Sequence, residues 1–140
     1  MNILIIDGRG GQLGGQLIKS LKVNFNDVKI MAVGTNAIAA ETMLKAGADQ
    51  AATGENSVIV ACRKADIIIG PVGIVVADAM LGEVTPKMAM AVGQADATRI
   101  LLPVNKCDTI IAGVSDISVT DILQDMLAKV RTVLEKRKVC

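Results

Sequence analysis

Short runs of isoleucine, valine and leucine alternate along the chain with longer stretches in which apolar residues recur every three or four positions. The short runs stop at glycine, proline or asparagine, as buried strands of a parallel sheet do. The longer stretches have the spacing of amphipathic helices. The pattern predicts strands at 2–7, 28–34, 66–70, 99–104 and 109–113, with a weaker indication of a short edge strand at 49–52.

Helices are expected between these strands. The first has an apolar face formed by Leu13, Leu17, Ile18 and Leu21. Others are expected at 36–45, 55–64 and 85–93, and a C-terminal helix is expected from Ser118, with apolar positions up to Leu134. Asn36, Thr85 and Ser118 stand where N-caps are favoured. Alternating strands and helices predict one α/β domain over residues 1–140. We expect a Rossmann-like parallel sheet of about five strands with helices on both faces.

Size and charge narrow the class of protein. A chain of 140 residues suits one domain and leaves no room for a separate substrate domain. Its 15 Lys and Arg against 14 Asp and Glu give a net charge of +1, which argues against nucleic acid as a partner. The longest uncharged apolar run, 67–77, is far short of the roughly 20 residues of a membrane span. The first residues read as a buried strand and not as a signal peptide, so we expect a cytoplasmic protein.

Missing residue types limit the chemistry. The chain has no histidine, tyrosine or tryptophan and one phenylalanine, so histidine-based catalysis and tyrosine general acids are excluded. Cys62, Cys107 and Cys140 are odd in number and far apart, which favours reduced thiols over a CxxC pair or a zinc cluster, and we expect no metal site. We expect Cys62 to be inert and Cys107, beside Lys106 in a loop, to be the most reactive thiol.

A glycine-rich turn, 8–14, joins the first strand to the first helix with the sequence GRGGQLG. Glycines let a phosphate approach the backbone, and the helix N-terminus offers unpaired N–H groups, so this turn is typical of a phosphate site. Arg9 can add an electrostatic attraction for the phosphate, screened by solvent. Asp7 would repel a phosphate, so we expect it to cap the loop N–H groups, or to hold a ribose hydroxyl or a magnesium ion. The alternative is that the glycines only allow close packing of helix on strand.

The details of the turn weigh against a redox dinucleotide without excluding it. The spacing from Gly10 to Gly14 is one residue longer than in GxGxxG, as in some NADP-dependent and short-chain dehydrogenases. Those families need a Tyr–Lys pair, and this chain has no tyrosine. An NAD site usually has an acidic residue about 20 positions further on. Here Gly34-Thr35-Asn36 ends the second strand, with neither a carboxylate for ribose nor an arginine for a 2′-phosphate. NAD(P) is therefore one candidate among nucleotides.

Loops that leave the carboxyl ends of parallel strands meet at one edge of the sheet, where ligands bind. Several polar or glycine-rich turns should join the glycine loop there, including 53–56 if the short edge strand forms. The residues expected to bind ligand are Asp7, Gly8, Arg9, Gly10, Gly11, Gly14, Gly34, Thr35, Asn36, Gly70, Pro71, Gly73 and Asn105. In the alternative of a small enzyme at this rim, Asp7, Lys106 or Cys107 would act as acid, base or nucleophile.

The stretch from Gly70 to Met88 is very apolar for a loop. It predicts either a core helix or an apolar face shared between subunits, since a monomer seldom exposes such a patch. Together with a strongly apolar C-terminal helix, it favours a homodimer or larger homo-oligomer. Its charged residues, Asp78, Glu83 and Lys87, are interpreted as solvated helix residues, with catalysis as the alternative.

Five segments of the chain carry a family resemblance: IDGRGGQLG, GTNAIAAETMLKAGAD, TGENS, GPVGIVVADAMLGEVTPKM and PVNKC. Together they resemble a bacterial family known only as a domain of unknown function. The resemblance implies a small Rossmann-like protein and brings no activity or site residue with it. From the residues themselves, the leading hypothesis is a nucleotide- or dinucleotide-binding protein that holds a phosphate-bearing small molecule at Gly8–Gly14. The small enzyme and an oligomeric scaffold without ligand are the alternatives.

Overall fold

The computed structural model describes residues 1–104 and 108–139. Along the chain the elements are β1 (Asn2–Asp7), α1 (Gln12–Asn24), β2 (Lys29–Gly34), α2 (Ala37–Lys45), β3 (Gln50–Thr53), α3 (Glu55–Lys64), β4 (Ile67–Pro71), a 3₁₀ turn η1 (Val72–Val75), α4 (Pro86–Gln94), β5 (Thr98–Leu102) and α5 (Val119–Val139). This alternation of strands and helices confirms the expected α/β fold.

All five strands form one parallel sheet in the order β3-β2-β1-β4-β5. The register sets the carboxyl ends of the strands level, with Asp7 beside Gly34 and Gly34 beside Thr53. From β1 the chain moves to β2 and β3 on one side, and β4 then returns to the other side of β1. The strand order thus reverses between β1 and β4, which is the topological switch point of a Rossmann-like sheet.

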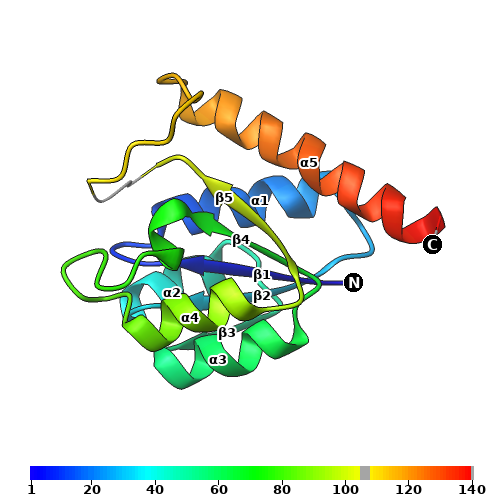
Figure 1. The fold of residues 1–140 in the computed structure, drawn as a ribbon. Coiled ribbons are helices and arrows are strands. Elements are labelled where there is room, and N and C mark those ends of the chain that lie inside the picture. Colours follow the sequence, from blue (N-terminus) through cyan, green and yellow to red (C-terminus); the bar gives the residue numbers. More distant parts are fainter. Residues whose placement is uncertain (105–107, 140) are drawn as a thin grey trace.

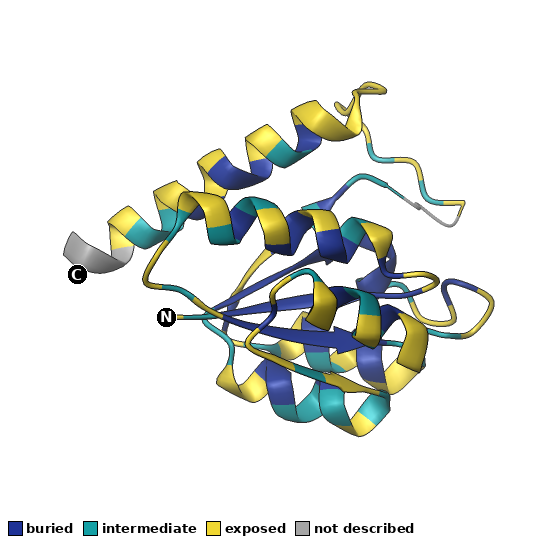
Figure 2. Ribbon diagram, turned by 180° about the vertical axis from the view of Figure 1, so that it is seen from behind, coloured by how far each residue is buried: buried dark blue, intermediate teal, exposed yellow. Residues whose placement is uncertain are grey.

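Helices cover both faces of the sheet (Figure 1). One face packs against α1, α2 and α5 through a core that contains Ile3, Ile5, Leu17 and Ile18. The other packs against α3, α4 and the segment after β4 through Leu4, Ile6 and their neighbours. Because both faces are covered, the central strands are apolar at almost every position, and Figure 2 shows them buried while the outer sides of the helices are exposed.

Local caps begin the helices where the sequence predicts them. Oδ1 of Asn36 accepts from the N–H of Ala39 over 2.8 Å, and Oγ of Thr85 accepts from that of Met88 over 3.1 Å. Ser118 does the same at the start of α5, with the N–H of Asp121 3.1 Å from its Oγ. These three predictions are confirmed. Within the described residues, no helix has the length and apolar character needed to cross a membrane.

Two expectations about the second half of the chain are wrong. Residues 109–113 form no strand and lie in turns and irregular backbone, with Ile110 93% exposed. The sheet still has five strands, because the short edge strand that the sequence indicates only weakly does form, as β3. The apolar stretch after β4 is partly core, as one alternative has it, but it is not the expected core helix. Between β4 and α4 it forms η1 and a series of turns that bury Ile74, Met80 and Val84 and leave Leu81 exposed.

Candidate functional site

The glycine loop lies at the carboxyl edge of the sheet, beside the switch point between β1 and β4. A hydrogen bond from the N–H of Gly11 to the carbonyl of Gly8, 3.0 Å long, closes the turn. Arg9 and Gly11 have positive φ angles of 51° and 73°, and α1 begins directly afterwards at Gln12. The loop therefore delivers the chain from a buried strand into a helix whose N-terminus points at this edge.

Asp7 is turned into the loop and caps it. Its Oδ1 accepts from the N–H of Gly8 and its Oδ2 from that of Gly14, both over 2.8 Å, and the residue is only 3% exposed. Burial raises the pKa of this carboxyl, while the two backbone donors and Arg9 oppose the rise and Glu83 adds to it. These contacts are those of the capping role, and both carboxylate oxygens are already engaged. Asp7 therefore holds the backbone of the glycine loop in place from the buried side.

Most of the predicted glycines stand where a side chain would collide with a neighbour. An added Cβ would lie 2.7 Å from the carbonyl oxygen of Ala39 at Gly11 and 2.5 Å from Sδ of Met43 at Gly14. Gly34 and Gly70 are similarly crowded, with backbone atoms 2.5 and 2.4 Å from the added Cβ. Close packing accounts for these four glycines.

Gly10 is different, because an added Cβ there would meet nothing within 4 Å. It is exposed and its φ is not positive. Nothing in the packing of this loop requires glycine at this position, whereas close approach of a ligand to the backbone does. Gly10 is therefore the glycine that the phosphate hypothesis explains and the packing hypothesis does not.

Three backbone N–H groups beside this open space have no acceptor among the described residues: those of Gly10, Gln12 and Leu13. The N–H of Gly14, in the first turn of α1, donates to Asp7, and that of Gly15 donates to the carbonyl of Gly11. The first N–H groups of a helix carry a partial positive charge. This end of α1 can therefore donate to an anion from several directions.

The neighbouring turn after β2 is joined to the loop by Asn36. Besides capping α2, its Nδ2 donates to the carbonyl of Arg9 over 2.9 Å. Thr35 stands next to it, and its N–H donates to the carbonyl of Asp7 over 3.0 Å. The structure thus brings Thr35 and Asn36 to the glycine loop, as the sequence predicts.

The loop after β4 contributes Glu83, a residue that the sequence led us to interpret as solvated helix surface. Its Oε1 accepts from the hydroxyl of Thr35 over 2.7 Å, from Nδ2 of Asn36 over 2.6 Å and from the N–H of Arg9 over 3.3 Å. That interpretation is wrong for Glu83, because the segment is a folded turn that reaches back over the site. Asp78 and Lys87 are exposed, as expected, but only Lys87 lies in a helix.

Other predicted site residues lie elsewhere. Gly70, Pro71 and Gly73 are buried at the end of β4 and in η1, beneath the rim surface. Thr53 lies on the far side of β2, with its hydroxyl donating to the carbonyl of Gly34 over 2.9 Å. Asn105, with the alternative catalytic residues Lys106 and Cys107, falls outside the described residues. Within the part of the chain that is described, no three of His, Cys, Asp or Glu are grouped to hold a metal ion.

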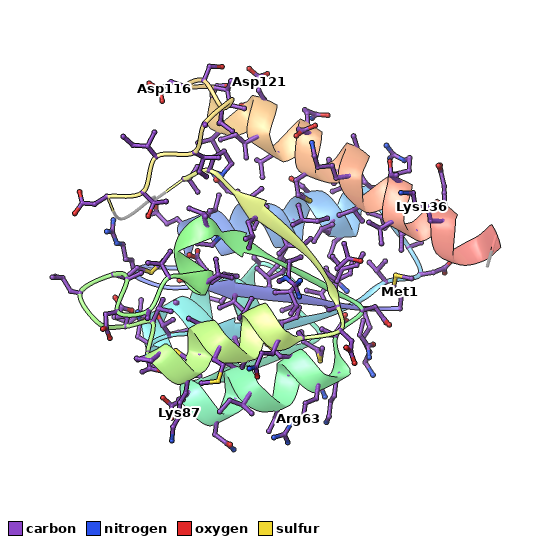
Figure 3. All side chains as sticks on the ribbon, viewed as in Figure 1. Met1, Arg63, Lys87, Asp116, Asp121 and Lys136 are labelled. Atoms are coloured by element: carbon purple, nitrogen blue, oxygen red, sulfur yellow. The ribbon has the colours of Figure 1, made fainter. Side chains whose placement is uncertain are left out.

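A separate hollow of about 560 Å³ lies on the helical face between α3 and α4. Its lining includes Cys62, Arg63, Lys87 and Asp96. Figure 3 shows Arg63 and Lys87 on the outer side of these helices, pointing away from the sheet. The hollow lies apart from the glycine loop and does not share its donors.

A five-stranded parallel sheet, doubly covered and carrying a glycine-rich turn at its switch point, defines a Rossmann-like α/β protein. The sequence matches the model of the domain of unknown function (DUF3842) over residues 2–135, and the chain belongs to this family. No curated protein matches the sequence.

Among solved structures, the chain is similar to the crystal structure of a dodecameric FMN-dependent UbiX-like decarboxylase from Escherichia coli O157:H7. The two share 16% sequence identity and superpose with a TM-score of 0.43, over 97% of this chain and 94% of that one. The FMN dependence and the dodecamer are properties of that protein.

Proposed function

We propose that this chain is a single-domain nucleotide- or dinucleotide-binding protein, in which the Gly8–Gly14 loop holds a phosphate group of the ligand. The observation that carries the proposal is the open backbone at Gly10, flanked by the N–H groups of Gln12 and Leu13 at the start of α1. Crowding explains the other glycines of the loop, so an uncrowded glycine beside free donors points to a ligand.

The alternatives are supported less well. An enzyme that uses Asp7 as acid or base is less well supported, because the side chain is buried and each of its carboxylate oxygens already accepts a backbone N–H. A scaffold without ligand accounts for Gly11 and Gly14 and leaves Gly10 unexplained. The rim offers a nucleobase only aliphatic side chains and no aromatic one, so its residues do not distinguish between nucleotides. NAD, NADP and simpler adenine nucleotides all stay candidates.

We also propose that the protein acts as a cytoplasmic homo-oligomer, although the apolar stretch after β4 contributes less to a shared surface than its sequence predicts. Much of the apolar stretch 74–92 is buried within the chain itself, Ile74, Val84, Met88 and Val92 included. What favours contact between copies is the segment before α5, where Ile110, Val114 and Ile117 are exposed. Light scattering at micromolar concentration that gives the monomer mass would contradict this.

Calorimetric titration of the wild type with NAD, NADP, ATP and AMP tests the proposed function. Gly10→Val places a branched side chain where the phosphate should approach, and we expect affinity to fall about tenfold or more, roughly 1.4 kcal/mol. The matched control is Gly93→Val in α4, where an added Cβ also meets nothing within 4 Å. Arg9→Ala should cost less, at most about 1 kcal/mol, and mainly reduce the salt dependence.

The scaffold alternative replaces the proposal under either of two results. One is that no phosphate compound binds the wild type more tightly than about millimolar. The other is that Gly10→Val and Gly93→Val bind equally well. Circular dichroism confirms that each variant is folded, and native mass spectrometry of freshly purified protein identifies any retained ligand directly.

A further inference from the structure

The end of β2 lacks an acidic residue in the sequence, yet the fold supplies one there. Gly34, Thr35 and Asn36 carry no carboxylate, whereas Glu83, 47 positions after Asn36, lies against both Thr35 and Asn36. In dinucleotide sites of this fold, a carboxylate at the end of the second strand accepts a hydrogen bond from the ribose 2′-hydroxyl. Glu83 brings a carboxylate to the end of β2 from a different loop.

The geometry of the carboxylate leaves one oxygen for a ligand. All three hydrogen bonds that Glu83 receives, from Thr35, Asn36 and the N–H of Arg9, go to Oε1. No described residue donates to Oε2, and the residue is half-buried. Oε1 thus fixes the side chain to both neighbouring loops, and Oε2 can accept a hydrogen bond from a ligand hydroxyl.

The segment that carries Glu83 holds it in a defined position. Its turns are closed by hydrogen bonds from the N–H of Val84 to the carbonyl of Ala79, 3.1 Å, and from the N–H of Glu83 to the carbonyl of Met80, 3.2 Å. Ala79, Met80 and Val84 are each 5% exposed or less and belong to the core beneath. The carboxylate is therefore placed by packing before any ligand arrives.

The charge of Glu83 distinguishes a ribose with a free 2′-hydroxyl from one that carries a 2′-phosphate. Hydrogen bonds from Thr35 and Asn36 and the nearby Arg9 hold the pKa of this carboxyl below its usual range against the opposing effect of burial, so it is ionised at neutral pH. An ionised carboxylate accepts a hydrogen bond from a 2′-hydroxyl and repels a 2′-phosphate. Arg9, which could offset the repulsion, is exposed and screened by solvent.

Resting on the proposed function, we infer that Glu83 is the residue that selects a nucleotide with an unmodified ribose 2′-hydroxyl and rejects one that carries a 2′-phosphate. The ligand class is thereby narrowed to NAD or a simple ribonucleotide, as opposed to NADP.

A different role for Glu83 would be to occupy the phosphate position itself and block it. The contacts argue against this role, because within the loop Glu83 receives a hydrogen bond from Arg9 alone. The N–H groups of Gly10, Gln12 and Leu13 receive nothing from it, and the space over Gly10 is open. The carboxylate lies on the β2 side of the loop, next to the phosphate position and not in it.

Titration of the wild type with AMP and with adenosine 2′,5′-bisphosphate tests the inference, since the two ligands differ only in the 2′-phosphate. We expect the wild type to prefer AMP at least about tenfold, and Glu83→Gln to reduce that preference to about threefold or less by improving the binding of the bisphosphate. The amide keeps an oxygen for the Oε1 contacts and removes the charge. Asp78→Asn, which removes one charge from the same loop without touching the site, is the matched control.

The outcomes separate the inference from the proposed function. If none of NAD, NADP, ATP and AMP binds the wild type, the proposed function fails and the inference with it. If AMP and the bisphosphate do not bind but NAD does, the same comparison is made with NAD and NADP, which also differ only in the 2′-phosphate. If both bind but the wild type shows no preference for AMP, the inference alone is overturned, and this measurement needs no variant to fold. A preference that Glu83→Gln leaves intact also overturns it. Equal tightening of both ligands in Glu83→Gln would assign Glu83 the blocking role instead.

Discussion

Oδ2 of Asp7 accepts the N–H of Gly14 over 2.8 Å, so the last residue of β1 holds the first turn of the helix that follows it. Its other oxygen, Oδ1, accepts the N–H of Gly8 over the same distance. One buried side chain thus fixes both ends of the glycine loop. The loop keeps its shape through this bridge, which leaves the N–H groups between the two ends free to face a ligand.

Asp7→Asn should destabilise the protein. An asparagine has one acceptor oxygen and an NH₂ group, so one of the two N–H groups would face a donor and lose its partner. Leaving a buried donor unsatisfied costs about 1–3 kcal/mol, and we expect the free energy of unfolding in urea at neutral pH to fall by that amount. Asp96→Asn, at an exposed position, is the control and should change little. A variant as stable as the wild type would show that the bridge does not hold the loop.

Substitution of Gly11 should destabilise the protein, whereas substitution of its neighbour Gly10 should leave the stability nearly unchanged. Gly11→Ala forces a Cβ to within 2.7 Å of the carbonyl oxygen of Ala39 at a φ of 73°. We expect a loss of about 2 kcal/mol or more. Gly10→Ala adds its methyl group in open space and should change stability by no more than about 0.5 kcal/mol. Equal losses in thermal or urea unfolding would mean that both glycines are structural.

The sequence predicts the fold well because the local residue pattern is enough to identify most of the strands. β1 and β2 are apolar at nearly every position and end at a turn residue, which is the pattern of a strand covered on both faces. The segment 109–113 has the same β-branched character but forms no strand. Whether such a segment becomes a strand depends on an available sheet edge, and no local pattern records that.

Part of the candidate site could be predicted in the same way, and part could not. The glycine loop and Asn36 adjoin elements with clear local signals, and the structure brings them together. Glu83 reaches the site through a turn in which Asp78, Met80 and Leu81 adopt positive φ angles. Non-glycine residues rarely do so, so the path of this loop cannot be derived from propensities. The presence of charged residues in a very apolar loop is the one signal that the sequence offers, and it does not distinguish Glu83 from Asp78.

Cys62 should be the slow thiol of the chain. It is 5% exposed, and burial raises its pKa to about 11, so at about pH 8 almost none of it is the reactive thiolate. We expect iodoacetamide to modify it much more slowly in the native protein than in urea, as followed by peptide mapping. The faster labelling of Cys107 stays a prediction from the sequence, and labelling of Cys62 ahead of Cys107 in the native protein would contradict it.

Asp49 should make stability depend on acidic pH. Its Oδ2 accepts the N–H of Ile30 and pairs with Nζ of Lys22, each over 2.8 Å, and these two donors lower its pKa in the folded state. Because the unfolded chain then binds the proton more tightly, the contribution is complete above the pKa of the unfolded chain. It is lost as pH falls through the lower pKa of the folded state.

The test compares Asp49→Asn with the wild type in urea unfolding from neutral pH to well below about pH 4. The variant should be less stable at neutral pH, and the difference should shrink as the solution becomes acidic.

The wild-type profile alone is not diagnostic, because the lowered pKa of Glu83 acts in the same direction and the raised pKa of Asp7 in the opposite one. Both contributions cancel in the difference between two proteins that share these groups. Asp27→Asn, at an exposed position, should give a small difference at every pH. A gap between Asp49→Asn and the wild type that persists or grows in acid would show that the lowered pKa of Asp49 does not stabilise the fold.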